Sequence, residues 1–272
     1  MTELRNGGIT AAGRKTASWI STRIWPKPEV VDQIEDRRIF LSNEIDQLFG
    51  STVRYGPFKG LRLSGLKWWG STDRAGMLLG LYEQEVLSVL ANIQPQYRKT
   101  FIDLGAANGY YAVGVLASSL FEKTYCFEMS EKGREAIRSN AALNGVAERI
   151  RIFGTAATDF YLELPEDVVS NSVLMVDIEG AEFEILTPET FEKFSNSVVI
   201  IELHDHFYQD GAQRLSSLKT RIGARFEVME LTTRGRDLSV FPELRRYGDT
   251  DRWLICSEGR KAQPHWYVLT PA

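Results

Sequence analysis

Short apolar runs alternate with longer stretches of helical period from residue 100 to the end of the chain. Short runs rich in valine, isoleucine and phenylalanine are typical of buried strands. They predict seven strands, at residues 100–104, 123–128, 149–153, 172–177, 197–203, 225–230 and 252–257. Strands that alternate with helices indicate a largely parallel sheet with helices on both faces. Because only a long loop separates the last two runs, we expect one of them to be an antiparallel edge strand.

The first hundred residues are less regular. The stretch from Pro28 to Gly50 predicts a helix. Residues 52–65 alternate in polarity and contain Gly-Pro and Lys-Gly turns, which predicts a β-hairpin. Residues 74–93 predict one amphipathic helix that Pro95 ends. We therefore expect an α/β fold: a Rossmann-like, seven-stranded, mostly parallel sheet with helices on both faces, preceded by a helix and a hairpin.

This change of pattern divides the chain near residue 75. We expect residues 1–75 to form an arm, a helix and a hairpin that serve as a cap or a dimer contact, and residues 76–272 to form the main domain. Residues 1–28 are rich in small and basic residues and include two tryptophans in SWISTRIW. Such a segment could touch an anionic membrane surface, but a mobile arm or a helix packed on the body is the simpler interpretation.

Composition narrows the class of protein. A net charge of −4 over 272 residues argues against a general nucleic-acid binder. Cys126 and Cys256 lie in apolar runs, which predicts buried thiols rather than a disulfide framework or a zinc site. No run approaches the roughly 20 apolar residues of a membrane span. The first residues lack the apolar stretch of a signal peptide, so we expect a cytoplasmic protein.

A glycine-bearing turn follows the first predicted strand, in FIDLGAANGYYAVGVLA. Gly105 permits a tight turn, and Gly109 would let a ligand approach the backbone at a helix N-terminus. Dinucleotide turns have the spacing G-x-G-x-x-G, whereas here Ala107 replaces the middle glycine. Asp103 would also repel a pyrophosphate. A carboxylate instead suits the ammonium and sulfonium groups of S-adenosylmethionine, which favours that ligand.

A second acidic residue follows the next strand. Glu128 lies 23 positions after Gly105, where a carboxylate can accept hydrogen bonds from both ribose hydroxyls. Ser130 is a candidate N-cap for the helix that follows, and Gly145 is suited to end it.

Five stretches together resemble the FkbM family of class I S-adenosylmethionine-dependent methyltransferases. They are LLGLYEQEV, FIDLGAANGYYA, FEMSEKGREAIRSNAALNG, LMVDIEGAEFEIL and VVIIELHDH, in the family's order within residues 78–205. Met129 departs from the proline usual in the family, and we expect it to pack on the adenine. The resemblance implies O-methylation of a hydroxyl on a sugar, glycolipid or natural product, with S-adenosylmethionine as cofactor and a small-molecule or glycan acceptor.

The turn and the resemblance together define the predicted cofactor site. Tyr82 and Glu83 match the family's Y-E pair, and Glu83 could hold the ammonium group or order the turn, although a tyrosine on an amphipathic helix is more often in the core. The predicted cofactor-binding residues are Glu83, Asp103, Gly105, Ala106, Asn108, Gly109, Tyr110, Glu128, Met129 and Asp177.

Acids and histidines gather at the ends of the fourth and fifth predicted strands. Asp177 and Glu179 end the fourth, while Glu182 could serve only the dipole of the next helix. Along the fifth, an extended backbone would place three side chains on one face: Glu202, His204 and His206. We predict Asp177, Glu179 and His204 as catalytic residues, with His204 as the base that takes the proton of the acceptor hydroxyl.

Alternatives stay open for this chemistry. Asp177, Glu202 and His204 could hold a divalent cation such as Mg²⁺, or the two histidines could have only a structural role. A non-catalytic protein that keeps the cofactor fold is one rival function. An NAD(P)-linked oxidoreductase is the other, and the turn disfavours it.

Aromatic residues outside these motifs also have two interpretations. Trp68, Trp69 and Arg74 could line an acceptor cleft or pack under the hairpin. Near the C-terminus, three residues could close over the cleft or contact a second subunit in a homodimer: His265, Trp266 and Tyr267.

Overall fold

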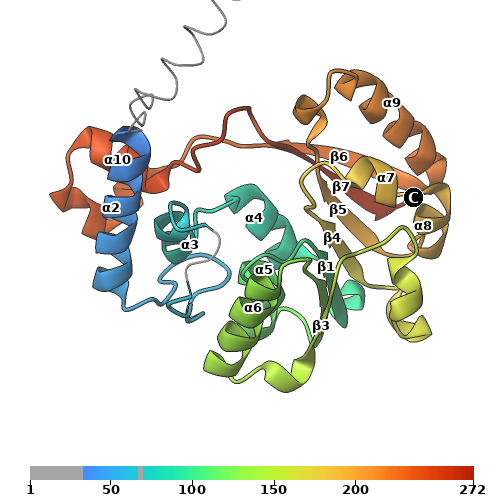
Figure 1. The fold of residues 1–272 in the computed structure, drawn as a ribbon, viewed down its shortest axis with the longest axis horizontal. Helices are drawn as coiled ribbons and strands as arrows, with labels where there is room; N and C mark the ends of the chain where they lie inside the picture. The colour runs from blue at the N-terminus through green and yellow to red at the C-terminus, as the bar shows by residue number, and fades with distance from the viewer. Residues whose placement is uncertain (1–32, 67–69) are drawn as a thin grey trace, which may run out of the picture.

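The computed structural model describes residues 33–66 and 70–272 (Figure 1). In this part of the chain seven strands form one sheet in the order β3-β2-β1-β4-β5-β7-β6. Their bounds are β1 Thr100–Leu104, β2 Lys123–Phe127, β3 Ile150–Phe153, β4 Val173–Val176, β5 Val198–Glu202, β6 Phe226–Thr232 and β7 His265–Pro271. Strands β1 to β5 pair in parallel, and β7 runs antiparallel to both of its neighbours. The predicted Rossmann-like α/β fold is confirmed.

Helices cover both faces of the sheet. The side chains alternate along β4, so that Val173 and Met175 face one layer whereas Leu174 and Val176 face the other. The first layer contains α4 (Gln84–Asn92), α5 (Tyr110–Ala117) and α6 (Glu131–Leu143). The second contains α7 (Glu182–Ile185), α8 (Pro188–Lys193) and α9 (Gly211–Ile222). Burial of both faces explains why these strands are continuous apolar runs.

The strand order reverses between β1 and β4. Strand β1 pairs with β2 on one side and with β4 on the other, so the connections that leave their carboxyl ends diverge. In open α/β sheets ligands bind at this switch point. The residues after Leu104, Phe127 and Val176 therefore surround one position.

A helical end of the molecule joins distant parts of the chain. Figure 1 shows α2 (Gln33–Phe49) and α10 (Asp249–Cys256) side by side, with α3 (Arg74–Leu79) close to them. Arg37 of α2 forms an ion pair with Asp251 of α10 at 2.6 Å. The buried Arg38 bonds to Asp73 and to the carbonyl of Ser257, both at 2.8 Å. The segment after β6 thus crosses to this end before it returns as β7.

The structure corrects the prediction for residues 74–93. Two helices, α3 and α4, replace the single helix because the chain turns between Gly80 and Glu83. Gly80 has φ of +68°, and a side chain there would overlap the carbonyl of Tyr55. Glu83 also has a left-handed backbone, with φ of +45°.

The prediction of a strand at residues 252–257 was wrong. This stretch ends helix α10, which buries Ile255 and Cys256 and leaves Trp253 exposed. The seventh strand is His265–Pro271, and it lies inside the sheet between β5 and β6, so the antiparallel strand is not at the edge. Trp266 and Tyr267 are fully buried in this strand, which rules out their predicted role in closing a cleft or contacting a subunit.

The N-terminal predictions have mixed outcomes. Helix α2 ends as expected before Gly50, while its predicted start and the whole arm of residues 1–28 lie outside the described residues, as do Trp68 and Trp69. The predicted hairpin is reduced to one antiparallel bridge between Thr52 and Arg62.

Two smaller expectations concern the cysteines and membrane spans. Both cysteines are buried and free, as expected. Within residues 33–66 and 70–272, no helix is long and apolar enough to cross a bilayer.

Candidate active site

The turn between β1 and α5 is shaped by packing against its neighbours. Gly105 has φ of +92°, and a Cβ there would overlap the carbonyl oxygen of Asp177, which directly follows the neighbouring strand β4. Gly109 has φ of +81°, and its Cβ would lie 3.1 Å from Ile137 and 3.2 Å from Val113. Gly109 therefore allows α5 to approach α6, while Gly105 allows β1 and β4 to end side by side.

Asp103, at the end of β1, is a buried carboxylate with an unused oxygen. Its residue is 2% exposed, and its Oδ2 has no hydrogen-bond partner among the described residues. Burial and the nearby charges of Glu128 and Glu83 raise its pKa to about 7, although the Ala112 amide opposes this. Asp103 lines a small cavity of about 30 Å³ together with Asp177 and the turn residues Gly105, Ala106, Asn108 and Tyr110. A buried acceptor without a donor is costly, so this position is suited to a ligand with donor groups.

Glu128 is fixed just after β2. Its Oε2 accepts a hydrogen bond from the Ala107 amide at 2.9 Å, and its Oε1 accepts one from the Ser130 amide at 2.7 Å. Both oxygens keep further lone pairs. A side chain at Gly133 would approach the Glu128 Cγ to 2.6 Å, so the first turn of α6 packs directly behind it.

Glu128 is one of the residues that line an apolar cavity of about 450 Å³. Met129, which is 75% exposed, lines it. Its lining also includes Asp177 and the apolar residues Phe127, Ala156, Ile178, Ala181 and Ile185. The cavity is large enough for a nucleoside-sized ligand whose polar edge faces Glu128.

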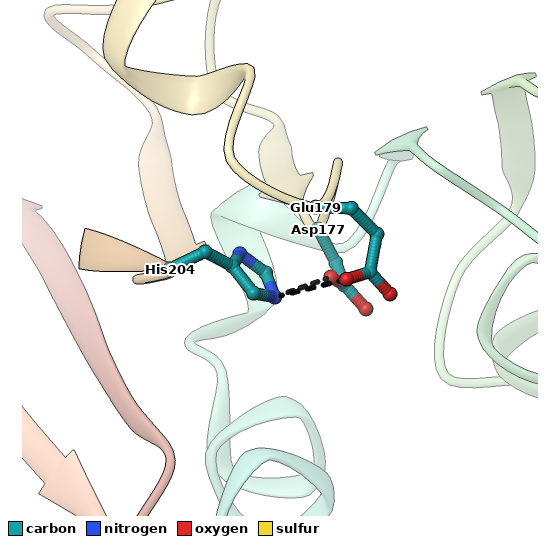
Figure 2. A group of neighbouring side chains, drawn as sticks. All are labelled: Asp177, Glu179 and His204. Carbon is teal, nitrogen blue, oxygen red and sulfur yellow. Dashed lines mark ion pairs between the residues drawn. The ribbon is translucent and has the colours of Figure 1, made fainter. Parts of the chain in front are cut away.

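The three predicted catalytic side chains, Asp177, Glu179 and His204, lie close together. Figure 2 shows the His204 ring pointing toward the carboxylates of Asp177 and Glu179. The Nε2 atom of His204 lies 3.7 Å from Asp177 Oδ1 and 3.7 Å from Glu179 Oε2. Glu202 Oε1 is 3.9 Å from the same nitrogen. His204 is 5% exposed whereas the Glu179 side chain is 56% exposed, so the group extends from the interior to the surface.

Glu182 also belongs to this group, although from the sequence it could have served only the helix dipole. It is completely buried at the start of α7. Its Oε2 accepts a hydrogen bond from the Gly180 amide at 2.8 Å, and its Oε1 accepts one from the His204 amide at 2.8 Å. Its Oε1 is also 3.3 Å from the Nδ1 of His204.

The charges in this group alter one another's ionisation. Burial raises the pKa of Asp177 and of Glu202, and neighbouring carboxylates raise them further. For His204, burial lowers the pKa, but the hydrogen bond to Glu182 and the charges of Glu202 and Glu179 outweigh it, so its pKa is raised. The site therefore favours positive charge.

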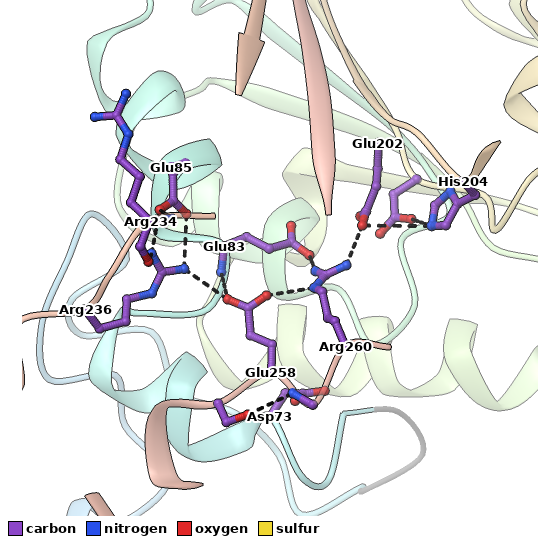
Figure 3. Close-up of polar contacts among 12 residues, drawn as sticks. Asp73, Glu83, Glu85, Glu202, His204, Arg234, Arg236, Glu258 and Arg260 are labelled. Carbon is purple, nitrogen blue, oxygen red and sulfur yellow. Dashed lines mark hydrogen bonds and ion pairs between the residues drawn. The ribbon is translucent and has the colours of Figure 1, made fainter. Parts of the chain in front are cut away.

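Arg260 is a residue of this acidic group that the sequence did not indicate. Figure 3 shows its guanidinium between Glu83 and Glu202, and it forms ion pairs with both. A third ion pair joins Arg260 to Glu258 at 2.8 Å. Glu83 is fully buried and also accepts a hydrogen bond from the Tyr111 hydroxyl at 2.8 Å. The predicted Glu83 thus lies in the acidic group, with Arg260 as its counter-ion.

A second arginine, Arg236, shares the partner Glu258 with Arg260. Arg236 contacts Glu85 at 2.5 Å and Glu258 at 3.1 Å, so Glu258 lies between two guanidinium groups (Figure 3). The Glu83 amide donates to Glu258 at 3.1 Å. This network holds the chain segment before β7 against the start of α4.

Two sets of ligand atoms are close enough together for a cation. The atoms of Asp177, Glu179 and His204 lie within 4.8 Å of one another, and so do those of Glu83, Asp177 and Glu202. Arg260 already supplies positive charge to the second set. The first set differs from the predicted metal site by the exchange of Glu202 for Glu179.

The remaining predicted residues have structural partners. Arg74 is buried in an ion pair with Asp46 at 2.8 Å and belongs to the helical end of the molecule. His265 pairs with Asp205 at 2.7 Å. His206 lies in a 3₁₀ turn after β5 and is exposed, so the extended geometry expected for the three side chains stops at Glu202.

The structure is that of a Rossmann-like α/β protein with acid-lined cavities at the switch point of its sheet. No model of a known protein family matches the chain, and no curated protein matches it. Solved structures with a similar arrangement include an O-methyltransferase from Bacillus cereus in complex with SAH, at 14% identity and a TM-score of 0.45, covering 94% of this chain and 97% of that one.

Two further solved structures resemble this chain at a comparable level. The O-methyltransferase TomG from Streptomyces achromogenes, in complex with SAM, has 13% identity and a TM-score of 0.45, covering 97% of this chain and 100% of that one. A precorrin-6y C5,15-methyltransferase from Geobacter metallireducens has 14% identity and a TM-score of 0.42, covering 70% and 89%. These similarities are too distant to assign a family or an activity to this chain.

Proposed function

We propose that this protein is an S-adenosylmethionine-dependent methyltransferase that methylates a hydroxyl group. The observation that carries the proposal is the set of acids at the ends of three adjacent strands, Asp103, Glu128 and Asp177, around the Gly105 turn. The Oδ2 of Asp103, which no described residue pairs with, supports a ligand that brings hydrogen-bond donors or positive charge. The ammonium and sulfonium groups of S-adenosylmethionine supply both.

Each part of this ligand has residues suited to it. Asp103 and Asp177 line the small cavity and would hold its cationic end. Glu128 would accept hydrogen bonds from the ribose hydroxyls. Met129 and Ile178 would pack on the adenine in the larger cavity. When bound, S-adenosylmethionine supplies an electrophilic methyl group on its sulfonium.

The chain itself would bind the acceptor and take its proton. The Nε2 of His204 lies beside Asp177 at the end of β4, and we assign it as the base for the acceptor hydroxyl. The carboxylates of Asp177 and Glu179 would stabilise the imidazolium that results. The motifs that resemble the FkbM family support a sugar, glycolipid or natural-product hydroxyl as the acceptor.

Calorimetric titration with S-adenosylmethionine, S-adenosylhomocysteine and NAD⁺ tests the proposal. We expect both sulfur ligands to bind and NAD⁺ not to bind. Glu128→Ala should weaken binding at least about tenfold, because a hydrogen bond to a charged group contributes about 1.5–3 kcal/mol. Glu135→Ala, at an exposed position of the following helix α6, is the matched control. Binding of NAD⁺ alone would instead favour an oxidoreductase.

A divalent cation is the alternative means of activating the hydroxyl. The spacing of ligand atoms in Asp177, Glu179 and His204 supports it. Titration with Mn²⁺, followed by electron paramagnetic resonance, separates the two routes. Stoichiometric binding that His204→Ala removes would make His204 a metal ligand, whereas absence of binding would leave it as the base.

A further inference from the structure

We infer that Glu182 is a positioning residue that holds the His204 ring with its proton on Nδ1 and so directs Nε2 toward the reacting centre. This inference rests on the proposed function, in which Nε2 of His204 takes the proton of the acceptor hydroxyl. It holds whether Nε2 accepts a proton or binds a cation. In both cases the working nitrogen must carry a free lone pair.

The Glu182 side chain is held by two backbone amides. Its two oxygens accept from the amides of Gly180 and His204, each at 2.8 Å. These bonds tie the turn after β4 to the residue that follows β5. The side chain therefore fixes the relative position of Asp177 and His204, which come from these two neighbouring strand ends.

The same carboxylate decides which ring nitrogen carries hydrogen. Glu182 Oε1 lies 3.3 Å from Nδ1 of His204. The same Oε1 already accepts a hydrogen bond from the His204 amide and so acts as an acceptor here, which makes Nδ1 the donor. In the neutral ring the lone pair is then on Nε2, which lies 3.7 Å from both Asp177 Oδ1 and Glu179 Oε2 (Figure 2).

A role for Glu182 in the helix dipole does not explain its burial. Helix α7 has only four residues, and an acid that serves a helix terminus can remain in water. Glu182 is instead 0% exposed, which carries a large desolvation cost. The three donors around it, two amides and the Nδ1–H group, offset that cost.

Replacement by glutamine keeps one of the two acceptor oxygens of Glu182. A glutamine amide has one acceptor oxygen and one donor NH₂ group. Gly180 and His204 each present an N–H to a different oxygen of Glu182, so the NH₂ group of Glu182→Gln must face one of them. Its oxygen can therefore remain toward His204 and still accept from the His204 amide and from Nδ1–H, with the NH₂ group toward Gly180. Leucine has no acceptor oxygen, so Glu182→Leu removes the partner of Nδ1–H altogether.

Nitrogen-15 NMR of the full chain tests the inference, since the protein has only three histidines. His206→Gln and His265→Gln identify the His204 signals. We expect wild-type His204 to show a protonated Nδ1 with a downfield, exchange-protected proton, in the neutral and in the charged ring alike. Glu182→Leu, which has no acceptor, should lose this proton signal and gain the Nε2–H form. Glu184→Leu, at a position whose side chain is 68% exposed on the same helix, should match the wild type.

The outcomes are distinct. A wild-type ring with an unprotonated Nδ1, or a Glu182→Leu spectrum identical to that of the wild type, would overturn the inference. If Glu182→Leu does not fold, the wild-type spectrum alone decides. Titration of the same samples with S-adenosylmethionine separates the two proposals: failure of the wild type to bind it removes the proposed function, whatever the state of His204.

Discussion

Replacing Asp103 by asparagine should stabilise the unliganded protein at neutral pH and weaken its binding of S-adenosylmethionine. Asp103 is 2% exposed, and its Oδ2 has no hydrogen-bond partner in the described part of the chain. Its carboxylate therefore loses the solvation of water without full compensation. A residue kept at such a cost indicates a function in binding rather than in folding.

The magnitude follows from the pKa of Asp103, which rises from 3.8 to about 7 on folding, chiefly through burial. At 1.36 kcal/mol per unit, this corresponds to about 4 kcal/mol as an upper bound. Below pH 4 the carboxyl is neutral in the folded and unfolded states, so it costs nothing. As the pH rises toward 7 the unfolded state ionises first, and the wild type loses stability; above pH 7 the cost is constant.

Urea unfolding between pH 4 and pH 8 measures this effect. The difference in free energy of unfolding between Asp103→Asn and the wild type should be smallest at pH 4 and grow in favour of the variant up to pH 7. The exposed Asp167→Asn should show no such trend. A difference independent of pH, or a variant less stable than the wild type at pH 8, would refute the reasoning. In calorimetry, Asp103→Asn should bind S-adenosylmethionine at least about tenfold more weakly.

Three further changes test other parts of the structure. Gly105→Ala should abolish soluble expression because its Cβ overlaps the neighbouring strand, while Gly235→Ala, which has open space around it, should express normally. Arg260→Ala should lower the free energy of unfolding in urea by about 3 kcal/mol, since it leaves buried carboxylates unpaired, and Glu202→Gln in the same chain should recover part of the loss. Met129→Ala should weaken cofactor binding in calorimetry without changing the melting temperature, because Met129 is 75% exposed and lines the cavity; a fall in melting temperature would place it in the core instead.

Local sequence patterns were sufficient to predict a strand where an apolar run is flanked by turn residues. Strands β1 to β6 are apolar runs bounded by turns, and their structure matches the prediction within a few residues. Because the carboxyl ends of parallel strands meet at one edge, the sequence could also place Asp103, Glu128 and Asp177 in one site. The paired glycines were correctly expected in a tight turn, but their contacts with Asp177 and Ile137 depend on packing between distant segments.

The C-terminal region shows what a single sequence does not determine. The run WLIC suits a strand or a helix equally, and only the packing of α10 on α2 decides between them. Arg260 was overlooked for the same reason, because it lies in the segment between α10 and β7, and that segment was placed after the last predicted strand. Its partners Glu83 and Glu202 are 177 and 58 positions away, beyond the reach of any local pattern. Glu182 had a sufficient local explanation in the helix dipole, and only its burial reveals its contact with His204.

A crystal structure of the protein with S-adenosylhomocysteine tests the central claim most directly. We predict that the Glu128 carboxylate contacts both ribose hydroxyls, that the adenine lies against Met129 and Ile178, and that the amino-acid end lies beside Asp103 and Asp177. A well-folded protein that binds no ligand, or that binds it away from these strand ends, would contradict the assignment of this protein as a methyltransferase.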